Sequence, residues 1–567
     1  MSFVLRALAA LSPVEPSLDG EFERAVAFAD IDANAETVAN AALGAVSVAL
    51  VLAGMIALSP LRGGVLVAGA TMAVGATIAV ALYECPGWVA TARRSRAAGD
   101  VPELIGLAAL RARVAPTPEE AAAFAGEHAG EPLAASLREH VRRAQGTPRA
   151  GWEGFATAWG DWDPSLRRAV SLLTAAVDAD AGDRERLLDR SLDVVLTGTR
   201  ERMSAFAASI RGPTSAIYAF GVVLPLALVA TLPAARAAGL PISMTVVVAM
   251  FDVALPCLLL GAAAWLVARR PAAFPPAPVP RSHPDVPDRR AVAVTCALLG
   301  GVLAWVGVGR IAPAWTRLVA TPGVALGAAL VCWYDPVRRV RERVSAVETG
   351  LADALSFVGQ RLQHGESLER AVAAAGDDLS GPVADVFADA ARTQTHLRVG
   401  VRASFLGEQG ALADVPSPRA RASAALLALA AREGGDGGRI LVEMAEYVDD
   451  LTAVERDARR NLASVTGTLR STAYCFAPLI GGVTVALAGR LGRTGASLDR
   501  ASAPLPTDAL GLAVGVYVVA LAALLVSLAA VLDRGFDRAL VGFHVGVAVA
   551  VASVLYPLSV AGASLLV

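Results

Sequence analysis

The feature that most constrains this chain is a repeated unit, in which apolar spans enclose a soluble helical segment. The two soluble segments cover residues 84–213 and 336–470. With an offset of about 250 residues, AAAFAGEHAGEPLAASLREHVRRAQ (121–145) lies over AVAAAGDDLSGPVADVFADAARTQ (371–394). The matched pairs include Glu119 with Glu369, Gly126 with Gly376, and Pro132 with Pro382. An internal repeat identifies the building unit of a chain. Here the unit is a membrane anchor joined to a soluble helical bundle.

The hydropathy of the chain predicts a membrane protein. Apolar residues make up 55% of the sequence, charged residues only 18%, and the mean hydropathy is +0.53. A spanning helix needs about 20 mostly apolar residues. Such segments occur at 38–58, 64–83, 214–232, 243–268, 291–309, 316–334, 471–489, 508–532 and 540–566. We therefore expect an all-α polytopic protein with about nine transmembrane helices and two duplicated cytoplasmic helical bundles.

These spans divide the chain into a predicted order of domains. The order is a cytoplasmic leader (1–37), a transmembrane hairpin (38–83), bundle 1 (84–213), transmembrane helices (214–268), a Pro-rich cytoplasmic linker (269–290), a second hairpin (291–335), bundle 2 (336–470) and three transmembrane helices (471–567). The linker contains PAAFPPAPVP, which cannot form a helix and is typical of a stiff spacer. Inside bundle 2, Leu351, Leu355, Val358 and Leu362 recur at helical spacing.

Arginine in the short loops predicts the orientation. Positive residues favour the cytoplasmic side of a membrane. If the spans alternate, the same side receives Arg93, Arg94, Arg96, Arg269, Arg270, Arg281, Arg289, Arg290, Arg338, Arg339, Arg341, Arg343, Arg534 and Arg538. We therefore expect a multi-pass protein of the cytoplasmic membrane, with a cytoplasmic N-terminus, an external C-terminus and both bundles in the cytoplasm.

Several chemistries are disfavoured by composition. All 50 basic residues are arginine, so a Walker-type phosphate loop and a Schiff-base site both lack their lysine. The net charge of −2 indicates no nucleic-acid partner. The six histidines and five cysteines form no HExxH or CxxC motif, so we expect no metal site, no cofactor and no catalytic residue. The GGDGG run (434–438) follows a helix rather than a strand and is interpreted as a turn.

Asp252 is the one acid deep inside a predicted span. An intramembrane carboxylate is costly and suggests function. It is either an ion or proton site on a transport route, or a group that pairs with a polar neighbour. Pro256, one turn later, frees a carbonyl and favours a local kink.

Two GxxxG pairs lie inside predicted spans, Gly323 with Gly327 and Gly511 with Gly515. Such pairs allow close helix packing. They serve either packing within one chain or a homodimer.

The order of motifs in the second half resembles a known family. LADALSFVGQRLQHGESLERAV (351–372), GP (381–382), EGGDGGRILVEMAEYVDDL (433–451) and FAPLI (476–480) are similar to the type II secretion system F domain. The first half is a weaker copy, in which Ala115 and Pro118 replace the Gly and Leu of the motif, while VVLPL (222–226) keeps the register.

The resemblance implies a non-enzymatic platform protein of type II secretion, type IV pili, archaeal pili or archaella. Such a platform docks on a hexameric secretion ATPase, and ATP-driven movement lifts pilin subunits from the bilayer; the family also implies a possible homodimer. Candidate partner-binding residues are Arg456, Arg459, Arg460, Glu443 and Glu446, with Glu433 and Asp436 beside them. These arginines serve either such a surface or the lipid headgroups. In such a platform, Asp252 would pair with a polar group of a neighbouring helix or contact pilin.

Two other functions remain open from the sequence. A secondary transporter would use Asp252 as an intramembrane ion or proton site, although transporter repeats consist of spans rather than soluble bundles. A membrane sensor with helical signalling blocks is the other, but no catalytic or phosphoacceptor motif supports it.

Overall fold

The computed structural model describes residues 8–12, 20, 22–23, 26, 34–58, 64–144, 151–160, 162–238, 242–271, 279–433, 435–498 and 506–566. Helices account for 87% of these described residues, which contain no strand. The predicted all-α class is therefore confirmed.

The first half of the chain contains the helices up to the Pro-rich linker. They are α3 (Ala35–Leu58), α4 (Gly64–Val114), α5 (Pro118–His128), α6 (Leu133–Arg143), α7 (Trp152–Gly160), α8 (Pro164–Val177), α9 (Ala181–Ser209), α10 (Arg211–Tyr218), the π-helix η1 (Ala219–Val223), α11 (Leu224–Ala237), α12 (Met244–Val248), the π-helix η2 (Ala249–Ala254) and α13 (Leu255–Ala268).

The second half contains the remaining helices. They are α14 (Arg290–Ile311), the 3-10 helix η3 (Ala314–Thr316), α15 (Arg317–Gln363), α16 (Leu368–Asp378), α17 (Pro382–Leu397), α18 (Val401–Leu406), α19 (Pro418–Glu433), α20 (Gly435–Ser471), the π-helix η4 (Thr472–Phe476), α21 (Ala477–Leu498), α22 (Thr507–Arg534) and α23 (Arg538–Leu566).

Eight helical stretches in the described residues are long and apolar enough to cross a membrane. They contain eight of the nine expected spans, so a multi-pass membrane protein is confirmed. The other expected span, residues 64–83, lies in α4, which is not among the eight. The count of nine therefore stays a prediction.

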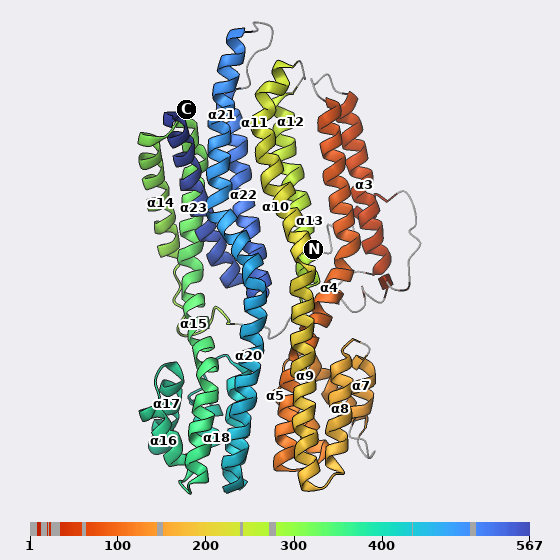
Figure 1. Cartoon of the computed structure of the whole chain (residues 1–567), viewed down its shortest axis with the longest axis vertical. Helices are drawn as coiled ribbons and strands as arrows, with labels where there is room; N and C mark the ends of the chain where they lie inside the picture. Colours follow the sequence, from red (N-terminus) through yellow and green to blue (C-terminus); the bar gives the residue numbers. More distant parts are fainter. Residues whose placement is uncertain are drawn as a thin grey trace.

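Both soluble segments lie at one end of the molecule, and the apolar helices lie at the other (Figure 1). Three stretches run from one end to the other as continuous helices of 50 to 56 residues: Ala181–Arg236, Ala314–Gln363 and Gly437–Leu491. α4 also extends from the apolar end into bundle 1 (Figure 1). Two long helices thus connect each bundle to the apolar part of the molecule: α4 and α9 for bundle 1, and α15 and α20 for bundle 2.

The two bundles share one hydrophobic core. A single cluster of buried side chains includes Leu104, Leu133, Trp152, Phe155 and Leu173 from bundle 1 with Leu355, Val372, Phe387, Leu441 and Val448 from bundle 2. Burial of apolar surface stabilises by about 25 cal/mol per Å². The bundles therefore stabilise one another.

A second core holds the apolar helices together. It contains Phe251 of η2, Tyr517 of α22 and Tyr556 of α23, all fully buried. The two tyrosine hydroxyls donate to backbone carbonyls, Tyr517 to Gly221 and Tyr556 to Gly511, the latter at 2.6 Å. A buried hydroxyl without a partner would be costly, so these bonds fix the positions of both rings.

Each of the three π-helices ends two residues before a proline: η1 before Pro225, η2 before Pro256 and η4 before Pro478. Proline lacks an amide hydrogen, and its ring meets the carbonyl four residues earlier. A wider π turn removes that conflict while the helix continues. A π turn therefore precedes Pro256, and the kink expected there stays a prediction.

Both GxxxG pairs pack within the chain. Gly323 and Gly327 of α15 lie against α23, where a side chain would meet Ser553 or the backbone of Gly546. Gly511 and Gly515 of α22 lie against Trp315 and Tyr556. These faces therefore serve close packing inside one chain, and the homodimer stays a prediction.

Parts of the expected leader and linker are described and contact the rest of the chain. In the leader, Phe22 and Val26 are buried with Val38 of α3. In the linker, the His283 ring nitrogen Nε2 lies 2.8 Å from the carbonyl oxygen of Asp414. The linker is thereby attached to bundle 2.

Candidate functional site

A cavity of about 730 Å³ lies where the two bundles meet the ends of the apolar helices. Its walls come from α4, the α5–α6 turn and α9 of bundle 1, from α15, α19 and α20 of bundle 2, and from the ends of α13, α22 and α23. We call it the junction cavity. Because both bundles and the ends of three apolar helices line it, movement of the bundles relative to those helices would change its shape.

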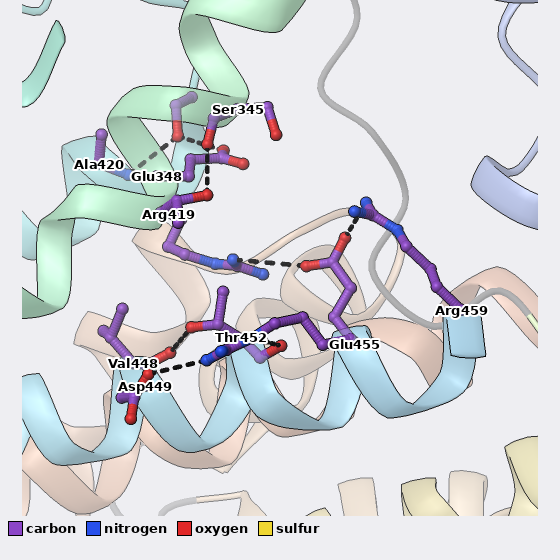
Figure 2. Close-up of polar contacts among 12 residues, drawn as sticks. Ser345, Glu348, Arg419, Ala420, Val448, Asp449, Thr452, Glu455 and Arg459 are labelled. Atoms are coloured by element: carbon purple, nitrogen blue, oxygen red, sulfur yellow. Dashed lines mark hydrogen bonds and ion pairs between the residues drawn. The ribbon is translucent and has the colours of Figure 1, made fainter. Parts of the chain in front are cut away.

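One wall of the junction cavity is a network of charges on α19 and α20 (Figure 2). Glu455 of α20 pairs with Arg459 one turn later, and Arg419 of α19 lies 4.0 Å from the same carboxylate. The hydroxyl of Ser417 donates to Glu348 of α15 at 2.5 Å. This network connects α15, α19 and α20 at the top of bundle 2.

The predicted arginine cluster divides into two kinds of residue. Arg459 lines the junction cavity and is paired with Glu455. Arg456 and Arg460 lie outside the cavity lining, and their side chains are 55% and 75% exposed. Their ion pairs, with Asp449 at 3.0 Å and Asp457 at 3.2 Å, are formed within α20. Exposed pairs of this kind contribute little to stability.

The predicted acids on α20 face bundle 1. Glu443 forms an ion pair with Arg113 of α4, which also pairs with Asp189 of α9. Glu446 lines a smaller cavity beside the same arginine. Glu433 and Asp436 lie outside the residues whose side chains are described. Glu443 thus holds the two bundles together.

Tyr447 is the centre of this contact between bundles. Its ring packs on Gly106 of α4, where any side chain would overlap it, and its hydroxyl donates to the carbonyl of Pro102. Burial raises the pKa of the tyrosine, so the hydroxyl stays protonated and remains a donor. Sequence reasoning missed Tyr447 and Arg113, because the residues they contact lie 76 to 345 positions away in the chain.

A second wall of the junction cavity, formed by α4, is acidic. Asp100 of α4 is only 3% exposed, and its carboxylate packs on Gly130, where a side chain would overlap it. Burial, together with the charges of Glu103 and Glu131, raises the pKa of Asp100 to about 8. Burial also raises the pKa of Glu103, against the opposing charge of Arg419.

Asp100 Oδ2 and Glu103 Oε1 have no hydrogen-bond partner among the described residues. The two acids are three residues apart in a helix, which places them on one face. That spacing, directly after Gly99, is the sequence signal that could have identified them.

Arginines gather at the membrane end of the cavity. Arg270 follows α13 and donates from Nε to the carbonyl of Leu532 at 2.9 Å. Arg341 of α15 pairs with Asp537 before α23, and Arg534 follows at the end of α22. The junction cavity therefore has an acidic end in bundle 1 and a basic end at the membrane helices. Arg93, Arg94 and Arg96 lie on α4 but outside the residues whose side chains are described.

Asp252 lies in η2, away from the junction cavity. One carboxylate oxygen, Oδ1, is buried and has no hydrogen-bond partner in the described part of the chain. The expected pairing with a polar neighbour is therefore not formed by this oxygen.

The described residues contain no group of three or more His, Cys, Asp or Glu side chains placed to hold a metal ion. Cys257, Cys296, Cys332 and Cys475 are free thiols, while the side chain of Cys85 is outside the described set.

Comparisons with models of protein families, with curated proteins and with solved structures find no match to this chain.

Proposed function

We propose that this chain is a non-enzymatic membrane platform of the type II secretion F domain kind, which couples a cytoplasmic secretion ATPase to the extraction of pilin-like subunits from the membrane. The observation that supports the proposal is the pair of helical bundles at one end of the molecule, each connected to the apolar helices by two long helices (Figure 1).

The continuous helices supply the mechanical coupling that such a platform needs. The stretches Ala181–Arg236 and Gly437–Leu491 pass from a bundle into an apolar span without a loop. A helix transmits a push along its axis because its backbone bonds are internal. A displacement applied to the bundles is therefore carried into the spans.

The distribution of arginine supports a cytoplasmic position for the bundles. Arg270, Arg341 and Arg534 come from three different segments expected on the cytoplasmic side, and all three line the junction cavity beside the bundles. Positive residues favour the cytoplasmic side. A reporter enzyme inserted in the 145–150 segment of bundle 1 should be active only in the cytoplasm, and external activity would rule out the proposed orientation.

The surface offered to the ATPase includes Arg456 and Arg460, which project from α20 outside the junction cavity. We expect the double variant Arg456→Glu/Arg460→Glu to lose co-purification of the ATPase while its level in the membrane stays normal. Arg459→Glu serves as the comparison, because Arg459 is paired inside the junction cavity. Equal co-purification by the double variant and the native protein would refute this surface.

Deletion of the gene tests the proposal as a whole. Cells without the chain should lack one class of surface filament or secreted protein in electron micrographs and secretion assays, and the native gene should restore it. Normal filaments and normal secretion would overturn the proposal.

A secondary transporter is the second candidate, and the buried, unpaired Oδ1 of Asp252 favours it. The two candidates make opposite predictions for Asp252→Asn. A platform keeps filament assembly, whereas a transporter loses ion-coupled uptake in reconstituted vesicles. Filament loss at a normal protein level would favour a functional role for this carboxylate.

A further inference from the structure

Two acids of the junction cavity differ from the others in having unsatisfied oxygens. Glu348 accepts from Ser417, Glu455 pairs with Arg459, and Asp533 pairs with Arg470 at 2.9 Å. Asp100 Oδ2 and Glu103 Oε1, by contrast, are buried without a hydrogen-bond partner in the described residues.

An unsatisfied buried carboxyl group is costly, because it loses its bonds to water and gains none in the protein. The Asp100 side chain is only 3% exposed to solvent, yet it lines an open cavity. Gly130 lets the backbone approach this carboxylate closely, so the packing around it is specific. A polar group aimed into a cavity under these conditions is placed to meet a ligand.

We propose that the junction cavity binds a small ligand through a primary ammonium group, held between the carboxyl groups of Asp100 and Glu103. An ammonium carries three donors on one compact cation, which suits two adjacent carboxyl groups. Metal ions are a poorer match, because calcium takes six to eight oxygen ligands and the described residues offer no cluster of three acidic or metal-binding side chains.

The volume of the cavity and its other charged residues restrict the size and charge of the rest of the ligand. A volume of about 730 Å³ is in the range of small-molecule sites. A linear polyamine could place its second ammonium near Glu131 or Glu348, while an aminophospholipid could place its phosphate near Arg270. Both sources provide the same ammonium group, and the experiment below distinguishes them. The inference does not depend on the filament role.

The protonation of the acids gives binding a defined pH dependence. The empty site retains a proton on Asp100 up to about pH 8. An incoming ammonium displaces that proton, so binding should tighten as the pH rises from 6 to 8. The charged or titratable groups that face the two acids are Glu131 beside Asp100, and Arg419, Glu348 and Tyr447 beside Glu103.

The test uses the full-length protein, titrated by calorimetry with spermidine in detergent and examined by native mass spectrometry in bilayers that contain phosphatidylethanolamine or only phosphatidylcholine. We expect saturable binding of spermidine or selective retention of phosphatidylethanolamine. Asp100→Asn and Glu103→Gln should each weaken binding at least tenfold. Glu369→Gln, at an exposed carboxyl on α16, should leave binding unchanged.

The outcomes separate the two sources. Spermidine binding alone identifies a free polyamine, and retention of phosphatidylethanolamine alone identifies a lipid headgroup. Binding of neither ligand, or equal binding by the native protein and both variants, overturns the proposal. Gel filtration checks that each variant is folded, and if Asp100→Asn fails that check, Glu103→Gln decides the result.

Discussion

In the first half of the chain, the helix that leaves the bundle reaches the π-helix η1 and then Pro225. In the second half it reaches the π-helix η4 and then Pro478, at an offset close to that of the soluble repeat. The bundles themselves are built differently. Bundle 1 has the aromatic helix α7 and a turn with a cis Glu131–Pro132 bond, whereas bundle 2 has Gly381 at positive φ before Pro382. The helices that leave the bundles and enter the membrane are therefore more alike in the two halves than the bundles themselves are.

The difference extends to the wall of the junction cavity. Asp100 in the first half corresponds, at the repeat offset, to Gly350 in the second. Asp100 lies against Gly130, while Gly350 lies against Val383, where a side chain would overlap. The first half therefore contributes a buried acid to the cavity, and the second contributes close helix packing. Four predictions test how separate the two halves are.

The largest effect is expected from Trp152→Ala in bundle 1 and Phe387→Ala in bundle 2. Both side chains are buried in the shared core, and each truncation should lower the free energy of unfolding by about 3–5 kcal/mol. Pulse proteolysis in detergent, with antibodies against each bundle, measures the effect. Because the core is continuous, each variant should expose both bundles to cleavage. Cleavage confined to the mutated bundle would show that they unfold independently.

A smaller effect is expected where Arg113 joins the bundles. Arg113→Ala leaves Glu443 and Asp189 without their common partner, and should cost about 1–3 kcal/mol. The variant should promote separation of the bundles, measured as faster hydrogen exchange in the segments around Tyr447 and Pro102, which meet across the contact. Arg460→Ala, at an exposed pair within α20, is the control and should change nothing.

The pH dependence of stability tests the asymmetry at Asp100. The unfolded chain releases this proton near pH 4, whereas the folded protein retains it up to about pH 8. Folding therefore takes up a proton between these values, and stability falls as the pH rises through this window. Asp100→Asn removes that contribution. The variant should melt at a higher temperature than the native protein at pH 8, and the difference should shrink toward pH 5.

The smallest effect concerns the π-helices. Tyr517→Phe removes the hydroxyl that donates to the carbonyl of Gly221 in η1, at a cost of about 1 kcal/mol. In the second half, Ser559→Ala removes the bond to the carbonyl of Leu479, next to Pro478. Backbone hydrogen exchange should increase only in η1 for Tyr517→Phe, and only in the turn of α21 around Leu479 for Ser559→Ala. A change at both would show that the two passages into the membrane are coupled through α22 and α23.

Local patterns were enough to predict the helices and most of the spans. The period of Leu351, Leu355 and Val358 predicted the helix of bundle 2, because a helical stripe depends only on nearby residues. The contact of Tyr447 with Pro102 joins positions 345 residues apart, and no local pattern contains it.

The candidate site was predicted only in part, for the same physical reason. Arg459 was identified from its charge, but its place in the cavity depends on α19 and α4 as well as α20. Asp100 was missed because its burial is produced by the α5–α6 turn, where Gly130 covers it.

The common core also has a consequence for biosynthesis. Bundle 1 leaves the ribosome about 250 residues before bundle 2, which at about 5–20 residues per second is an interval of roughly 10–50 s. Four candidate spans must be inserted before the missing partner is complete. During that time the apolar side of bundle 1 that Tyr447 and its neighbours later cover is open to solvent and to other nascent chains. A holding chaperone, or rapid translation of the intervening spans, would protect it.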